Sequence, residues 1–95
     1  MGYYYQHKLG FSFHCLQRIR ERIPLFKEEN DWVIKEKIIK MIENSSEWIE
    51  TRHNLYIKLD DLEGNLYVVV EKQHRLIVTV TPMSPNKLLD VITKN

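Results

Sequence analysis

The chain of 95 residues is 43% hydrophobic and 28% charged, and fourteen Lys and Arg residues against thirteen Asp and Glu residues give a net charge of +1. This composition is typical of one globular domain over residues 1–95, and it excludes disordered, fibrous and strongly basic chains. The single cysteine excludes an internal disulfide framework, and no apolar run reaches the ~20 residues that cross a bilayer, so no membrane partner is expected. Without a secretory signal, a cytoplasmic location is expected.

Two helices are predicted first, over residues 12–23 and from residue 30 or 31 to residue 44. Ser12 can cap the first helix, and Pro24 ends it because proline lacks a backbone donor. Apolar side chains recur on each helix at the spacing of a stripe that faces a core. These side chains are Cys15, Leu16, Ile19 and Ile23 on the first helix and Ile34, Ile38, Met41 and Ile42 on the second.

After Glu47 the sequence alternates with period two, which is typical of strands. Three strands are predicted, over residues 55–59, 66–71 and 76–81, and residues 48–50 could add a short extra strand. Gly64 or Asn65 can take the positive φ of the first turn. Pro85 opens a short C-terminal helix. We therefore expect an α+β fold with two N-terminal helices, a three-stranded antiparallel sheet and a short C-terminal helix.

The two faces of this predicted sheet differ in polarity. One face would be wholly apolar and would pack under the helices, with Leu76, Val78 and Val80 as its part of the last strand. The other face would be mixed, and it would suit a bound polymer or partner as well as it suits a solvated surface of good β-formers. Its members include Tyr56, Lys58, Tyr67, Ile77, Thr79 and Thr81.

His14, Arg18 and Arg22 stand at successive i,i+4 positions of the first helix and form one ridge, with steps of ~6 Å along its axis. Histidine exchanges protons near neutral pH, and arginines bind phosphate and the charge that develops on it during cleavage. The ridge is therefore a candidate phosphodiester-cleaving site. The same spacing equally fits an exposed helix side whose arginines pair with acids such as Glu21.

The remaining candidates for chemistry are weaker. Cys15 falls on the apolar side of the first helix and is predicted to be a buried small hydrophobe. The four histidines lack the spacing of a zinc site, and no glycine-rich phosphate loop is present, so no metal and no cofactor are predicted. His74 lies in the turn before the last strand and could bring a second acid–base group.

Residues 11–23 carry a resemblance to a small bacterial and phage domain family. Its members open with the pattern F-[ST]-x-H-[AC]-x-x-R-[MI]-x-x-R, and the second arginine here is Arg22, in the run Glu21-Arg22-Ile23. They end in a strand that resembles residues 76–81. In layout this family is similar to the RelE, BrnT, EndoU and colicin D group of small metal-independent ribonucleases, several of which are toxins.

The resemblance implies an endoribonuclease that cleaves RNA by attack of the RNA's own 2′-hydroxyl, without a metal. It implies that His14 acts as base or acid, that Arg18 and Arg22 bind phosphate, and that Thr79 or Thr81 lies nearby. Tyr67 and Thr79 would position the substrate, and His74 would be the second proton carrier. The expected partners are RNA, in free or ribosome-associated form, and an antitoxin.

Two other expectations remain open. The chain could be a non-enzymatic phage or bacterial module that binds and inhibits a host protein, because aromatic side chains dominate binding surfaces. Its contact residues would be Trp48, Tyr56, Tyr67 and residues 3–5, a run of three tyrosines. An exposed strand edge, which Lys58 and Glu71 would only weakly protect, could also pair two copies into a homodimer.

Overall fold

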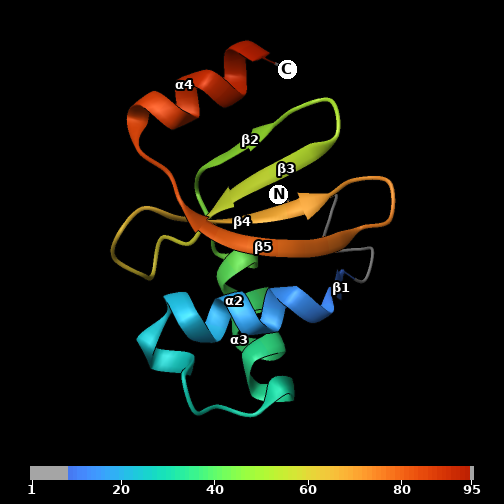
Figure 1. Ribbon diagram of the computed structural model, residues 1–95, viewed down its shortest axis with the longest axis vertical. Coiled ribbons are helices and arrows are strands. Elements are labelled where there is room, and N and C mark those ends of the chain that lie inside the picture. The colour runs from blue at the N-terminus through green and yellow to red at the C-terminus, as the bar shows by residue number, and fades with distance from the viewer. Residues whose placement is uncertain (1–8, 95) are drawn as a thin grey trace.

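Strand β1 opens the part of the chain that the computed structural model describes, residues 9–94. The tyrosine run at residues 3–5 lies outside this range. Two helices follow β1, then four strands and a last helix (Figure 1). The elements are β1 (Gly10–Phe11), α2 (Phe13–Arg22), the 3-10 helix η1 (Pro24–Phe26), α3 (Asp31–Glu43), β2 (Trp48–Glu50), β3 (Asn54–Lys58), β4 (Leu66–Glu71), β5 (Leu76–Pro82) and α4 (Pro85–Lys94).

The sheet within residues 9–94 has five strands in the order β1-β5-β4-β3-β2, with β1 parallel to β5 and the other pairs antiparallel. The predicted architecture of two N-terminal helices and a three-stranded antiparallel sheet is therefore wrong. A two-residue strand has no periodicity to read, and the register pairs Gly10 with Leu76, far along the chain. The edge strands of this sheet are β1 and β2. Lys58 on β3 and Glu71 on β4 therefore lie on inner strands and protect no edge.

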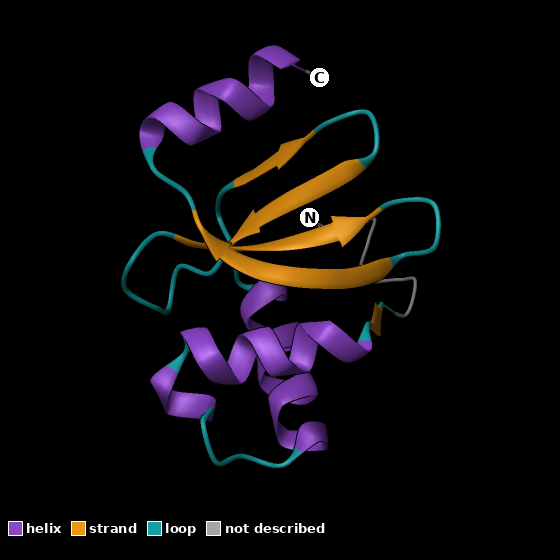
Figure 2. Ribbon diagram, viewed as in Figure 1, coloured by secondary structure: helices purple, strands orange, loops and turns teal. Residues whose placement is uncertain are grey.

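Helices α2 and α3 lie together below the sheet in Figure 2, whereas α4 lies above it. The apolar stripes of α2 and α3 pack against one face of the sheet and form the core, as the helical spacing predicts. Leu16 and Met41 are only partly buried at its margin. The buried core residues are Cys15, Ile19, Ile23, Phe26, Ile34, Ile38, Ile42, Leu55, Ile57, Leu59, Leu66, Val68, Val70, Ile77 and Val80.

A β-bulge in β5 changes which of its side chains face the core. Val69 pairs with Thr79 but Val70 pairs with Ile77, so Val78 has no partner in the register. In the part of β5 that precedes the bulge, the alternation of inward and outward side chains is reversed. Ile77 is therefore fully buried, whereas the sequence predicted it on the mixed face. The predicted inward facing of Leu76 and Val78 is wrong for the same reason.

Helix α2 is bonded to strand β5 near both of its ends. At its start, the Ser12 amide and hydroxyl donate to the carbonyls of Ile77 and Val78 at 3.0 and 3.3 Å, and the hydroxyl also accepts from the Cys15 amide at 3.1 Å. The predicted N-cap role of Ser12 is thus confirmed. At its end, Nη1 of Arg22 donates to the carbonyl of Val80 at 2.6 Å. These bonds fix α2 along the strand.

The turn between β3 and β4 lies beside the start of α4. Gly64 and Asn65 take positive φ values of 91° and 51°, as their residue types allow. The Met83 amide donates to the Asn65 carbonyl at 3.1 Å and thereby joins the end of β5 to this turn. Ser84 then accepts the Lys87 amide on its hydroxyl. Within the described residues, no helix is long and apolar enough to cross a membrane.

Candidate functional site

The ridge predicted on α2 is exposed along its length and follows strand β5. His14, Arg18 and Arg22 are all exposed, and His14 lies about 12 Å from Arg22 along the helix axis, at ~1.5 Å per residue. The imidazole of His14 meets the ring of Phe13 edge to face, with centroids 5.9 Å apart. The three side chains therefore form a line that is long enough to follow a strand of polymer, and they do not converge on one atom.

Arg18 forms the ion pair that the alternative interpretation expects. Its Nη1 lies 3.3 Å from Oε2 of Glu21, and both side chains are about half exposed, at 51% and 45%. Exposed pairs of this kind stabilise a protein by only ~0–1 kcal/mol. The guanidinium can therefore exchange Glu21 for a phosphate at little cost.

Arg22 lines a hollow of about 490 Å³ at the end of β5, which we call the polar hollow. Five segments meet there: the end of α2, the β3–β4 turn, the start of β4, the end of β5 and the first turn of α4. Neither Lys87 nor Glu63 forms an ion pair with a residue that the structure describes. The lining residues are Arg22, Glu63, Gly64, Leu66, Thr81, Pro82 and Lys87.

The other predicted site residues do not line this hollow. Tyr67 pairs with Thr81 across the sheet but is only 4% exposed, and burial, aided by the Glu47 carboxylate, raises its pKa. Thr79 lies one step further along the same face, opposite Val69. The structure thus brings Arg22 and Thr81 together, while Tyr67 and Thr79 flank them on the sheet.

His74 lies at the opposite end of β5 from Thr81. Oε2 of Glu71 lies 3.0 Å from its Nδ1 and accepts from its backbone amide at 2.8 Å. The hydrogen bond from the His74 backbone amide is the main reason that the pKa of Glu71 lies below its usual range. His74 is therefore held to its own turn by Glu71.

Cys15 is fully buried, which confirms its predicted role as a small hydrophobe. Burial raises the pKa of its thiol to about 12, so the thiolate that nucleophilic chemistry needs is not formed near neutral pH. Among the described residues, no group of three or more His, Cys, Asp and Glu side chains is placed to hold a metal ion.

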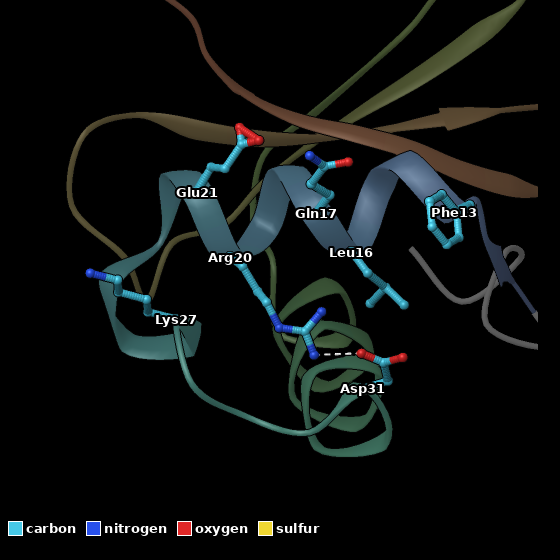
Figure 3. Close-up of a pocket in the computed structure, with 7 residues that line it drawn as sticks. All are labelled: Phe13, Leu16, Gln17, Arg20, Glu21, Lys27 and Asp31. Atoms are coloured by element: carbon cyan, nitrogen blue, oxygen red, sulfur yellow. Dashed lines mark hydrogen bonds and ion pairs between the residues drawn. The ribbon is translucent and has the colours of Figure 1, made fainter.

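A second hollow, of about 450 Å³, lies on the opposite flank of α2 toward η1 and α3 (Figure 3). We call it the apolar groove, because Phe13, which is 85% exposed, and Leu16 form one end of it. Arg20 crosses its floor and donates to the carboxylate of Asp31 and to the carbonyl of Glu29. Gln17, Glu21 and Lys27 complete its lining.

The sequence pointed to Arg22 but missed Glu63 and Lys87. Glu63 directly precedes Gly64 in the predicted turn, and the turn is present. One feature of the sequence could have drawn attention to Lys87, namely its position in the first turn of the predicted C-terminal helix. A lysine in the first turn of a helix opposes the helix dipole, which favours acidic residues there. Its position across from Arg22 depends on the packing of segments that are distant in sequence.

No family model, curated sequence or solved structure matches this chain. The resemblance of residues 11–23 to the metal-independent ribonuclease group therefore stays a prediction, and the site rests on the geometry of this chain alone.

Proposed function

We propose that the protein is a metal-independent endoribonuclease that binds RNA along the ridge of α2. The observation that carries the proposal is that the ridge ends in the polar hollow, where Arg22 and the sheet residue Thr81 line one surface. A cationic side chain and a hydroxyl group, brought together from a helix and a strand, suit a phosphate and its ester oxygens. Such an enzyme would act on RNA in the cytoplasm.

In this proposal the cleavage occurs beside His14. The neutral imidazole accepts the proton of an RNA 2′-hydroxyl, and the 2′-oxygen forms a bond to the adjacent phosphorus. The bond from phosphorus to the 5′-oxygen breaks, and the leaving oxygen takes a proton from solvent water. The products are a 2′,3′-cyclic phosphate and a 5′-hydroxyl. Arg18 and Arg22 neutralise the phosphates that follow along the strand.

The test is incubation of RNA with the protein in excess EDTA, with and without ribosomes. We expect fragments that end in 2′,3′-cyclic phosphate, and we expect His14→Ala to abolish them because the proton acceptor is lost. His53→Ala is the matched control, since His53 is exposed on the β2–β3 turn and should leave cleavage unchanged. RNA that stays full length with the unmodified protein, with or without ribosomes, would contradict the proposal.

The apolar groove favours a second candidate function, an interaction module that binds a host protein. An aromatic ring as exposed as that of Phe13, next to Leu16, is typical of a residue that anchors a partner. Tyr67, which the sequence offered as a contact residue, is too buried for that role. For this function Phe13→Ala should abolish binding of a purified partner, whereas Arg22→Ala should leave it intact. Equal effects of the two variants would count against it.

A further inference from the structure

Lys87 occupies a position that local helix energetics disfavour. It lies in the first turn of α4, which contains no acidic residue. The N-terminal end of a helix carries partial positive charge, so an acidic side chain would stabilise this turn and a lysine does not. Residues that break a local rule without a compensating contact are typical of functional sites.

Arg22 is held in place and still has donors to offer. One N–H of its guanidinium is bonded to the carbonyl of Val80. A guanidinium has five N–H donors, so most remain available to a ligand in the polar hollow. A cation anchored in this way loses little conformational freedom when it binds an anion.

Glu63 brings a negative charge to the same hollow, so the hollow is not built for an anion alone. A carboxylate repels phosphate but accepts hydrogen bonds from hydroxyl groups. The exposed ring of Pro82 adds an apolar surface to the lining, and Leu66 lies buried behind it. A ligand that satisfies all of these groups carries a phosphate, a hydroxyl and an apolar ring, and it fits a hollow within the ~300–1,000 Å³ range of ligand sites.

We propose that the polar hollow binds one ribonucleotide unit of an RNA strand. Its phosphate lies between Arg22 and Lys87, its ribose 2′-hydroxyl donates to Glu63, and its base packs on Pro82. This inference rests on the proposed function for the identity of the polymer. It adds a subsite about 12 Å from His14 along the helix axis, and it assigns the preference for RNA over DNA to Glu63.

The experiment measures binding of a short RNA and of the DNA of equivalent sequence, with uracil replaced by thymine, to the full-length His14→Ala protein, which prevents cleavage. We expect RNA to bind about tenfold more tightly than DNA, because one hydrogen bond to a charged group is at stake. The backbone amide signals of Gly64 and Thr81 should shift in NMR spectra as the RNA is added.

Two further substitutions, each added to the His14→Ala protein, separate the contribution of the phosphate contact from that of the 2′-hydroxyl contact. Lys87→Ala should weaken RNA and DNA about equally, by roughly tenfold, since both polymers carry the phosphate. Glu63→Ala should remove the preference for RNA and should slightly tighten DNA. Lys37→Ala, which removes an exposed lysine of α3, is the matched control and should change neither affinity by more than about twofold.

Equal affinity of the starting protein for RNA and DNA, or a preference that survives Glu63→Ala, would overturn the inference. Binding that Lys37→Ala weakens as much as Lys87→Ala would overturn it too, because it would show nonspecific charge attraction. RNA-selective binding that depends on Glu63, from a protein whose unmodified form cleaves no RNA, would support the subsite and refute the proposed nuclease. The failure of one proposal is thus distinguishable from the failure of the other.

Discussion

The two hollows that flank α2 are similar in size, about 450 and 490 Å³, but they use their arginines differently. In the apolar groove Arg20 is bonded within the protein, to Asp31 and to the carbonyl of Glu29. In the polar hollow Arg22 makes one bond, to Val80, and Lys87 and Glu63 pair with no described residue. Of two arginines that are two positions apart on one helix, one is thus bonded to an internal acid, and the other is the one that we propose binds RNA.

This difference shows why the spacing of charges along a helix does not by itself identify a site. Arg20 and Arg22 both stand in the last turn of α2, where a positive charge is favourable. What separates them is the neighbour that the tertiary fold supplies, an aspartate in one case and a strand carbonyl in the other. A charge that is satisfied internally contributes to stability, whereas a charge with spare donors is available to a ligand.

The largest expected effect comes from exchanging these two arginines for alanine. Arg22→Ala should weaken RNA binding by about tenfold or more, because a phosphate loses its charged donor. Arg20→Ala should leave RNA affinity unchanged and lower the free energy of unfolding by about 1 kcal/mol, since a partly exposed ion pair is lost. Fluorescence anisotropy with labelled RNA and urea unfolding measure the two quantities. Equal losses of RNA affinity would break the contrast between the hollows.

A somewhat smaller effect is expected where α2 begins. Ser12→Ala removes the N-cap and the bond from its hydroxyl to the Val78 carbonyl, which should lower the free energy of unfolding by about 1 kcal/mol. Ser12→Thr keeps the hydroxyl and should recover most of that loss. If urea unfolding shows Ser12→Ala to be neutral, the attachment of α2 to β5 does not depend on this side chain.

The smallest effect concerns the turn that carries Glu63. Asp60 accepts hydrogen bonds from the amide and hydroxyl of Ser46 at 2.7 and 2.9 Å, and these bonds hold the pKa of its carboxyl below its usual range. A lowered folded pKa means that the carboxylate stabilises the protein above the unfolded value, near 3.8, and that this stabilisation is lost as pH falls through the folded value.

Asp60→Asn should therefore lower the Tm slightly at pH 7, and the difference from the unmodified protein should shrink toward pH 2. Asp61→Asn is the matched control, because Asp61 is exposed in the same turn. Thermal unfolding followed by circular dichroism at both pH values measures the effect. A Tm difference that stays constant from pH 7 to pH 2 would contradict this account of Asp60.

The sequence predicts the elements whose signals are local and misses those that depend on distant partners. The cap at Ser12, the stop at Pro24 and the turn at Gly64 follow from the chemistry of single residues, and the structure confirms them. Strand β1 and the bulge at Val78 could not be predicted, because a short strand exists only through its partner and a bulge only through its register. The parallel pairing of β1 makes the sheet mixed and five-stranded, and the bulge changes which side chains of β5 face the core.

The residues of the candidate site also include one with a local signal in the sequence and others that depend on distant partners. Arg22 could be identified from its spacing to His14 and Arg18, all of which belong to one helix. Glu63 and Lys87 come from a turn and a helix that meet Arg22 only in the folded chain. A single sequence carries no information on that meeting, since nothing in the residue types of the turn or of α4 names Arg22 as their neighbour.

The parallel pairing of β1 with β5 has a consequence for the order of folding. Ser12 is bonded to a carbonyl 66 residues later, so β1 can complete the sheet only after β5 has been synthesised. The β3–β4–β5 meander needs only short loop closures and should form first, and the closing strand should join late, because long loops are slower to close. Substitutions in β1 should then mainly accelerate unfolding, whereas substitutions in the meander should slow folding.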